Sequence, residues 1–390
     1  MRGAAVVQVA IPAVFMRGGT SKGLLLHARD LPLDRDEWTT LLCGAMGSPD
    51  PYGRQLDGMG GGVSSLSKVC VIGEPTRPDA DLDYTFVQVM IAEGRLDFRT
   101  NCGNMSAAVG PFAVDEGLVS ADGERCVVRI HNTNTGKIIR STFDVDVESG
   151  RARYDGDFLI PGVATRGAPV HLDFLDPGGA STGRLLPTGV SQDTIDVATR
   201  GPVTVSLIDA ANAAVFVHAS SVGLSGVELP AQLEEDRGSL ALLEGLRRQA
   251  SVRMGLAGDL AGAARITGVP FVCLVTEATE SITLSGELIP ATNADLVIRV
   301  ISHTQPHRAM PLTIALCTAV AARISGSVVA DALSHAAASP PTGPLRLATP
   351  SGVLTVDATV TERDDTWVAT SGSFVRTARR LFDGRVWSHR

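Results

Sequence analysis

The chain has 390 residues, of which 44% are hydrophobic and 19% charged, a composition typical of a soluble globular protein large enough for two domains. A net charge of -8 and an aromatic content of 4% provide neither the basic surface nor the base-stacking side chains of a nucleic-acid-binding protein. No apolar run reaches the roughly 18 residues that a membrane-spanning helix needs.

The chain opens with an apolar stretch, residues 4–15, of which residues 6–15 loosely alternate in a way typical of a strand. Gln8 and Pro12 interrupt it and no small-residue cleavage pattern follows, which argues against a signal peptide. The six cysteines show no Cys-x-x-Cys pair and no Cys/His spacing suited to zinc, so we expect reduced thiols and no metal. These features predict a cytoplasmic protein without membrane or nucleic-acid partners.

Further along, pairs of β-prone segments are separated by short turns, which predicts β-hairpins. The four predicted hairpins join residues 84–91 to 95–98, 126–130 to 137–146, 201–208 to 213–217, and 345–349 to 353–360. Hairpins in this number argue against the regular strand–helix alternation of a doubly wound parallel sheet.

Two helices are predicted to be buried, because they are apolar on all sides. The first follows Asn101 and runs to about Glu116, with Pro111 inside it and Gly117 as its stop; the second covers residues 311–322. One such helix lies among hairpins in each half of the chain. We therefore predict an α+β fold of two pseudo-duplicated domains, each a curled, mostly antiparallel sheet around a buried central helix.

The domain boundary is predicted in the stretch 162–189, which is dense in Gly, Pro, Ser and Thr. This places an N-terminal domain at 1–185 and a C-terminal domain at 190–375. The last segment, 376–390, can return to the first domain. An amphipathic stretch, 233–254, is expected to pack on the surface of the second domain.

Only three of the 34 basic residues are lysines: Lys22, Lys68 and Lys137. Arginine serves wherever a cation is needed for solubility, but arginine cannot lose its proton, whereas lysine can act as a base. A lysine kept against this bias is a candidate for proton chemistry, although one or more of the three can have survived by chance. Lys68 stands out because a glycine run lies just before it and an Asn-Cys-Gly-Asn sequence follows it.

Cys102 is the second candidate for proton chemistry. Asn101 is a natural N-cap, which places Cys102 in the first turn of a buried helix. The free amides and the dipole at a helix N-terminus favour a thiolate over a thiol. Gly103 permits a close approach of the backbone, and Asn104 adds an amide in the same turn. The other five cysteines are interpreted as inert packing.

The segment between these features resembles an anion cradle, because a glycine turn that includes Gly61 and Gly62 precedes the hydroxyls of Ser64, Ser65 and Ser67. Two nucleotide-binding patterns fail here: neither Lys22 nor Lys68 follows a glycine, as the Walker motif requires, and Val63 replaces the third glycine of the dinucleotide fingerprint.

Two more segments can bind anions. The turn containing Arg17, Thr20 and Ser21 offers a guanidinium for a carboxylate, unless it is only a strand-end turn. His303 and His307 precede the second buried helix, where they either form a second anion subsite or only stabilise the loop. We expect the active site in a cleft between the two domains.

These segments together resemble the PrpF family, isomerases of methylaconitate and related acids within the diaminopimelate-epimerase-like superfamily. The stretches that carry the resemblance are residues 16–23, 64–69, 101–108, 206–212 and 376–380, and residues 46–62 are similar to the aconitate-isomerase branch. The resemblance implies a cofactor-free enzyme whose acid–base pair is Lys68 and Cys102. Many members carry a lysine after the proline that corresponds to Pro270; this chain has Phe271, so that part of the substrate site is expected to differ.

We therefore expect an allylic isomerase or tautomerase that acts on a small unsaturated di- or tricarboxylate without a cofactor or a metal; a homodimer is left open. The first alternative is an amino-acid epimerase or racemase of the same fold, which needs a second thiol at the other central helix, where Cys317 lies too far inside. The second alternative is a non-catalytic carboxylate-binding protein.

Overall fold

The computed structural model describes residues 8–99, 101–197, 200–334, 343–364 and 366–389. The chain forms two compact units: unit 1 contains residues 1–172 and 375–390, and unit 2 contains residues 173–374. The chain passes from one unit to the other within β9 (Val170–Leu175) and returns within β20 (Thr366–Arg376). Within the described ranges, no helix is both long enough and apolar enough to cross a membrane.

Unit 1 is built on a curled, mixed sheet in which β1, β2, β3, β4, β6 and β7 follow one another as neighbours. The pairs β2–β3 and β4–β6 are parallel, and the other pairs are antiparallel. Its strands are β1 (Gln8–Gly18), β2 (Ser21–His27), β3 (Lys68–Gly73), β4 (Leu82–Val89), β5 (Leu96–Asp97), β6 (Arg125–Asn132), β7 (Lys137–Asp146), β8 (Arg151–Ala152) and β21 (Ala378–His389).

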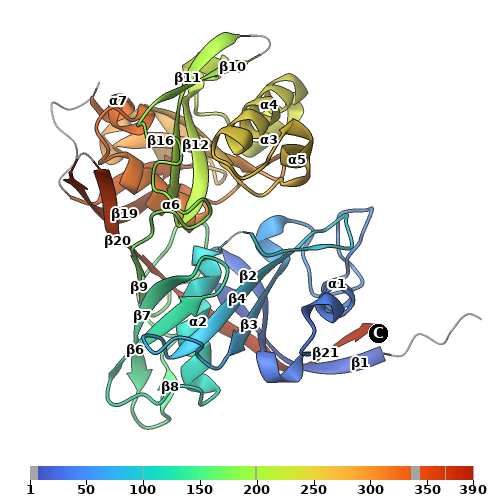
Figure 1. Cartoon of the computed structure of the whole chain (residues 1–390). Helices are drawn as coiled ribbons and strands as arrows, with labels where there is room; N and C mark the ends of the chain where they lie inside the picture. Colours follow the sequence, from blue (N-terminus) through green and yellow to red (C-terminus); the bar gives the residue numbers. More distant parts are fainter. Residues whose placement is uncertain (1–7, 100, 198–199, 335–342, 365, 390) are drawn as a thin grey trace, which may run out of the picture. The chain divides into compact units, whose positions relative to one another are not determined.

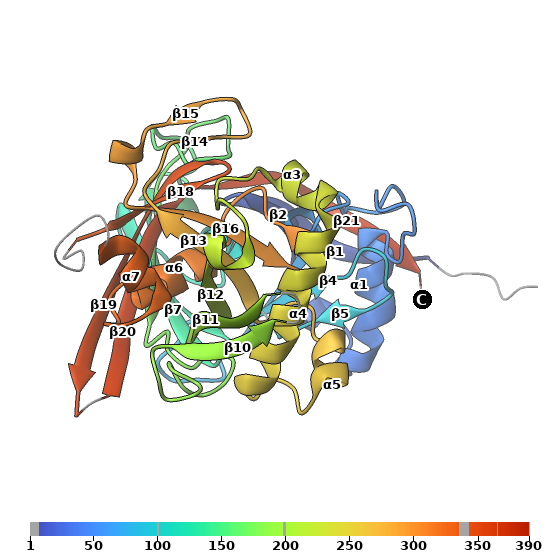
Figure 2. The same cartoon turned by 90° about the horizontal axis from the view of Figure 1, so that it is seen from above.

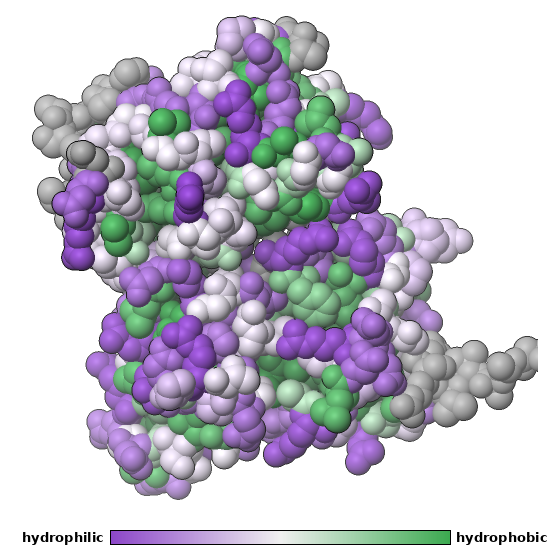
Figure 3. Space-filling model, viewed as in Figure 1, coloured by the Kyte–Doolittle hydropathy of each residue, from purple (hydrophilic) through white to green (hydrophobic). Residues whose placement is uncertain are grey.

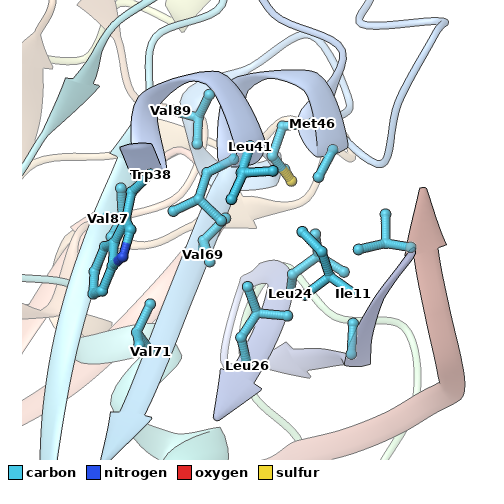
Figure 4. Close-up of a cluster of buried hydrophobic side chains, with 14 of the residues drawn as sticks. Ile11, Leu24, Leu26, Trp38, Leu41, Met46, Val69, Val71, Val87 and Val89 are labelled. Atoms are coloured by element: carbon cyan, nitrogen blue, oxygen red, sulfur yellow. The ribbon is translucent and has the colours of Figure 1, made fainter. Parts of the chain in front are cut away.

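The two faces of this sheet are covered by α1 (Trp38–Met46) and α2 (Gly103–Asp115). Each residue of α2 from Gly103 to Val114 is buried, and Figure 1 shows the helix enclosed by the strands of its unit. On the other face, Leu41 of α1 packs with Val69 and Val71 of β3 (Figure 4). Because side chains alternate along a strand, Lys68 and Cys70, which alternate with these valines, face α2.

In unit 2, β10, β11, β12, β13, β16, β18, β19 and β20 follow one another as hydrogen-bonded neighbours. Besides β9 and β20, the strands of unit 2 are β10 (Asp193–Val197), β11 (Gly201–Ala210), β12 (Asn212–His218), β13 (Phe271–Glu277), β14 (Ser281–Ile282), β15 (Leu288–Ile289), β16 (Leu296–Ser302), β17 (Gln305–Pro306), β18 (Leu345–Thr349) and β19 (Gly352–Arg363).

The helices of unit 2 cover both faces of β11 and β12: α3, α4 and α5 lie on one side, and α6 and α7 on the other (Figure 2). They are α3 (Pro230–Glu235), α4 (Arg237–Arg253), α5 (Leu260–Arg265), α6 (Leu312–Ala321) and α7 (Val328–Ser334). Every residue of α6 is buried, as predicted for the second central helix. On the viewed face of each unit, hydrophilic and hydrophobic side chains are interspersed (Figure 3).

The two units share one topology, which confirms the predicted duplication. Each unit begins with an antiparallel hairpin, and the next strand pairs in parallel with the second strand of this hairpin. A further strand pairs antiparallel with it and is followed by the central helix. After the helix, one strand returns parallel to the strand before the helix, and the last strand pairs antiparallel with that one. In unit 1 these elements are β1, β2, β3, β4, α2, β6 and β7. In unit 2 they are β11, β12, β13, β16, α6, β18 and β19. The four predicted hairpins correspond to pairs of these strands or to β4 and β5.

Unit 1 ends at Leu172, whereas the sequence predicted a first domain up to residue 185. The intervening residues pack within unit 2, because the backbone amides of Ser181 and Thr182 donate to the Asp209 carboxylate at 2.8 and 2.6 Å. The C-terminal segment returns to unit 1, where β21 runs antiparallel to the whole of β1.

Candidate active site

Lys68 is the first residue of β3, and its side chain lies on the face of the sheet that packs against α2. Val69 and Val71 belong to the core on the opposite face, so alternation turns Lys68 and Cys70 inward. Lys68 is only 8% exposed, and its amine lies 4.9 Å from the centre of the Phe86 ring. Its Nζ donates a hydrogen bond of 2.8 Å to Oε1 of Gln88 on β4.

The loop before Lys68 is organised around the buried side chain of Gln55. Its Nε2 donates to Oγ of Ser48 at 2.9 Å and to Oγ of Ser67 at 2.7 Å, while its Oε1 accepts from the Gly62 amide at 3.1 Å. Gly62 adopts a positive φ of 73°, which a glycine takes without strain. One side chain thus links the end of the glycine turn to Ser67, the residue before Lys68.

This arrangement divides the predicted serines into two kinds. The hydroxyl of Ser67 is buried and donates to the Val89 carbonyl at 2.9 Å, in addition to its bond from Gln55. Ser64 and Ser65 begin a short 3-10 helix, Ser64–Leu66, and are partly exposed, as are Gly61 and Gly62. Of the three predicted hydroxyls, those of Ser64 and Ser65 are therefore the ones accessible to a ligand.

Cys102 is the N-cap of α2, whereas the sequence predicted Asn101 in that place. The Asn101 side chain instead accepts a hydrogen bond of 3.1 Å from Nδ2 of Asn132, which ties the helix entry to the turn between β6 and β7. Gly103 and Asn104 are the first two helical residues, so their amides lie at the helix N-terminus next to the thiol.

Cys102 also differs from the other five cysteines in its exposure. All six lie in the described ranges; Cys102 is partly exposed and the rest are buried. Burial raises the pKa of the Cys43 thiol to about 11, and it likewise raises the pKa values of Cys70, Cys126, Cys273 and Cys317. These five thiols are therefore held in their protonated, unreactive form.

The buried thiol of Cys70 is influenced by both candidate residues. Lys68 and Cys102 both lie close enough to this thiol to affect its pKa electrostatically, although burial is the dominant cause of its upward shift. The Cys70 thiol contacts the Tyr84 hydroxyl at 3.8 Å, and Ser106, one turn into α2, donates to the Cys102 carbonyl at 3.1 Å. The Cys70 thiol and the Tyr84 hydroxyl thus form a buried polar contact whose thiol is influenced by both candidate residues.

The hairpin turn between β1 and β2 docks on the same helix terminus. The backbone amide of Thr20 donates to Oδ1 of Asn104 at 3.2 Å, and Ser21 is buried as the first residue of β2. Gly19 has a positive φ of 53°, and a Cβ at this position would collide with the Asn104 side chain. The Gly-Gly-Thr-Ser turn therefore reaches the N-terminus of α2 because it lacks side chains at its closest point.

Arg17 holds this turn against the C-terminal strand. Its guanidinium donates to the carbonyls of Gly19 and Thr377, each at 3.0 Å, and of Ala378 at 3.5 Å. Burial, followed by the neighbouring charge of Arg379, lowers the pKa of Arg17. In this structure the guanidinium that was predicted to capture a carboxylate is engaged by backbone carbonyls.

His303 and His307 belong to unit 2, in the β16–β17 hairpin. His303 contacts Oγ1 of Thr267 at 3.0 Å through Nδ1, and His307 contacts Oγ of Ser302 at 2.7 Å through Nε2. The His307 ring also packs on Phe271, with 5.9 Å between ring centres. Both histidines are thus anchored in their own unit, and their contribution to a ligand site stays a prediction.

Sequence reasoning missed the two glutamines that support this site. Gln88 occurs in the run 84–91 of otherwise mostly apolar strand residues, and a polar residue at a buried strand position is a signal that it has a partner. Gln55 gives no such signal, because its contacts depend on the loop conformation. Among the described residues, no three His, Cys, Asp or Glu side chains gather in a way that could hold a metal ion.

The fold of this chain is shared with solved structures of low sequence identity. Its backbone is similar to the structure of a probable proline racemase from Agrobacterium radiobacter K84, with a TM-score of 0.53 and 14% identity over 96% of this chain and 92% of that one. It is also similar to the structure of a hydroxyproline epimerase from Agrobacterium vitis, with a TM-score of 0.54 and 13% identity over 97% of this chain and 92% of that one. At such low identity the similarity shows a common racemase- and epimerase-type fold.

The chain belongs to the PrpF protein family, whose model matches residues 8–389. It is 38% identical to the 3-methylitaconate isomerase of Eubacterium barkeri over 97% of both chains, and 38% identical to the 2-methyl-aconitate isomerase of Cupriavidus necator over 98% of both. It is also 37% identical to the 4-oxalomesaconate tautomerase of Pseudomonas putida, over 97% of this chain and 96% of that one. The crystal structure of a methylitaconate-delta-isomerase covers 98% of this chain, and 96% of that chain is matched, with a TM-score of 0.78.

Proposed function

We propose that this protein is a cofactor-independent isomerase that moves a double bond in a small unsaturated di- or tricarboxylate by proton transfer between Lys68, Cys102 and the substrate. The observation that supports this proposal is that Lys68 is a buried residue at the start of β3, while Cys102, the one partly exposed cysteine among the described residues, is the N-cap of α2; both affect the pKa of Cys70 electrostatically. The substrates named for its relatives, methylitaconate, methylaconitate and oxalomesaconate, belong to the same chemical class.

The proposed reaction is an allylic proton shift. One of the two residues removes a proton from the carbon next to the double bond, and the electron pair of the broken C–H bond is delocalised into the conjugated carboxylate as a dienolate. The other residue then gives a proton to the far allylic carbon, and the double bond forms at the new position. A positioned base contributes about 10² to 10⁴ in rate.

The dienolate carries more negative charge on its carboxylate oxygens than the substrate does. The amides of Gly103 and Asn104 at the start of α2, and the hydroxyls of Ser64 and Ser65, are proposed to donate to these oxygens. Preorganised donors of this kind are each worth about 3 to 4 kcal/mol in the transition state. Thr20 and Ser21 are proposed to complete the part of the substrate site that unit 1 provides. Arg17 and Ser67 support it from behind through the hydrogen bonds described above.

An amino-acid racemase of the same fold would need a second thiol at the N-terminus of α6. There the N-cap is Pro311, and Cys317 is buried in the interior of the helix, where its sulfur contacts the Ile208 carbonyl at 3.6 Å. This observation favours the allylic isomerase over the racemase.

The test is to incubate the protein in D2O with aconitate, 2-methylaconitate, 3-methylitaconate, 4-oxalomesaconate and L-proline, and to follow each by proton NMR. We expect the vinyl signals of at least one unsaturated acid to be replaced by those of its isomer, while proline remains unchanged. Exchange of the proline α-proton without isomerisation of any acid would support a racemase. Tight binding of an acid without turnover would indicate a non-catalytic carboxylate-binding protein, and either result would refute the proposal.

A further inference from the structure

Gln88 lies directly opposite Lys68 in the antiparallel β3–β4 pair. Side chains that face each other across such a pair are close neighbours, and here the Lys68 amine donates to Gln88 Oε1 at 2.8 Å. Gln88 is only 5% exposed, so water does not compete freely for this acceptor. The contact lies inside the unit, on the side of the sheet that faces α2.

The orientation of the Gln88 carboxamide is fixed by its other end. Its Nε2 donates to the carbonyls of Ser67 at 2.8 Å and Ser64 at 3.1 Å. In the flipped orientation, the carboxamide oxygen would face two carbonyl oxygens, and the NH2 group would face the lysine amine, which also donates. Hydrogen-bond chemistry therefore turns the oxygen toward Lys68.

We infer that Gln88 is a positioning residue that holds the Lys68 amine in its working orientation; this inference rests on the proposed function of Lys68. A lysine side chain has four rotatable bonds and loses about 2 kcal/mol of rotamer entropy when it is fixed. The Gln88 oxygen and the Phe86 ring together confine the amine before substrate binds.

The neutrality of Gln88 is part of this role. A carboxylate at the same distance would form an ion pair with the lysine and stabilise its protonated form. A carboxamide accepts the hydrogen bond without adding a charge, so it orients the amine and still lets the amine release and recover a proton. Through Ser64 and Ser67, it also fixes the amine relative to the segment that carries the proposed substrate-binding hydroxyls.

The experiment compares Gln88→Met, which keeps the length of the side chain but removes both ends of the link, with Gln88→Glu, which adds a charge. Thr85→Val is the matched control, because it removes a partly buried hydrogen bond of 2.7 Å between Thr85 on the same strand and Thr133. The measurements are kcat and KM on the acid that the wild type isomerises, the thermal unfolding midpoint, and the NMR titration of ε-13C-labelled lysine. With only three lysines in the chain, the Lys68 resonance is assigned from its absence in Lys68→Arg.

In Gln88→Met we expect kcat to fall about 10- to 100-fold with KM changed less than about threefold, the size of effect that small misplacements of a reacting group produce. Thr85→Val should keep kcat within about twofold at a comparable loss of stability. In Gln88→Glu, the titration midpoint of the Lys68 resonance should rise by about one pH unit or more.

An unchanged Lys68 titration in Gln88→Glu would overturn the inference, as would a kcat loss in Gln88→Met no larger than that of Thr85→Val. If Gln88→Met does not fold, the Gln88→Glu titration decides alone. The NMR readout needs no turnover, so a wild type that isomerises none of the acids would refute the proposed function while the contact between Gln88 and Lys68 is still tested.

Discussion

Lys68 and Phe271 occupy equivalent places in the two units: each is the first residue of a strand that pairs in parallel with the second strand of a hairpin. Lys68 is in register with Gly23 of β2, and Phe271 with Ala214 of β12. The N-termini of the two central helices also correspond in position but differ in residue: Cys102 is the N-cap of α2 and Pro311 is the N-cap of α6. The duplicated fold thus carries a lysine and a thiol in unit 1 where unit 2 has a phenylalanine and a proline.

Substitution of Lys68 separates proton transfer from charge. Lys68→Arg keeps the positive charge but cannot titrate, so we expect it to lower kcat nearly as much as Lys68→Met, by about 10² to 10⁴. Steady-state kinetics of both variants on the isomerised acid is the measurement. If Lys68→Arg retains a large part of the wild-type rate, Lys68 only binds a carboxylate.

Cys102 should be the first thiol to react with iodoacetamide. The other five cysteines are buried and their pKa values are raised, whereas Cys102 is partly exposed at a helix N-terminus. Lys68→Met should slow the labelling of Cys102 by about tenfold or more at neutral pH, because a neighbouring ammonium stabilises the thiolate. Peptide mapping by mass spectrometry checks both points.

Labelling of another cysteine before Cys102, or an unchanged rate in Lys68→Met, would contradict this pairing. An unsaturated tricarboxylate such as aconitate should protect Cys102 in the wild type. Succinate, which lacks the double bond and the third carboxylate, is a suitable control for protection by any small dicarboxylate.

Gly19→Ala should lower the free energy of unfolding by more than the backbone strain of the substitution alone, because it also disturbs the turn that docks on α2. Gly19 and Gly136 both have positive φ values, 53° and 68°, but only at Gly19 would an added Cβ collide with another residue, Asn104. An alanine in this conformation costs about 1 to 2 kcal/mol, so Gly136→Ala should lower the free energy of unfolding by that amount and Gly19→Ala by more. Urea denaturation measures both; equal losses would show that the approach to Asn104 is not tight.

Catalysis should persist without metal ions. No ligand cluster is present among the described residues, and the proposed dienolate is stabilised by amides and hydroxyls instead. Activity should survive exhaustive EDTA treatment with less than about a twofold change in rate. Loss of activity that a divalent cation restores would show that the reaction uses a metal.

The hairpins, the two buried helices and their duplication were predictable because they depend on local patterns. Alternation along the strands marks β6 and β7, and an unbroken apolar surface marks α2 and α6. Pro111 does not end α2, which continues to Asp115. The N-cap was misplaced by one residue, since Asn101 finds a partner in Asn132 and leaves the cap position to Cys102.

The contacts that support the candidate site were less predictable, because they join distant parts of the chain. Arg17 donates to the carbonyl of Thr377, which lies 360 residues further along. The Gln55 contacts require a residue with a positive φ of 51° inside a loop. By contrast, the scarcity of lysine and the position of Cys102 ahead of an apolar helix indicated the proposed acid–base pair, since both depend only on residue type and local spacing.

The most direct test of the proposed acid–base pair is isomerisation in D2O by the wild type, Lys68→Met and Cys102→Ala, followed by proton and deuterium NMR. We predict that the wild type forms an isomer with deuterium at the allylic carbon that receives the proton. Each variant should lose net isomerisation by about 10² or more, while one of them still exchanges the proton at the carbon served by its remaining residue. Isomerisation at close to the wild-type rate by either variant would contradict the account.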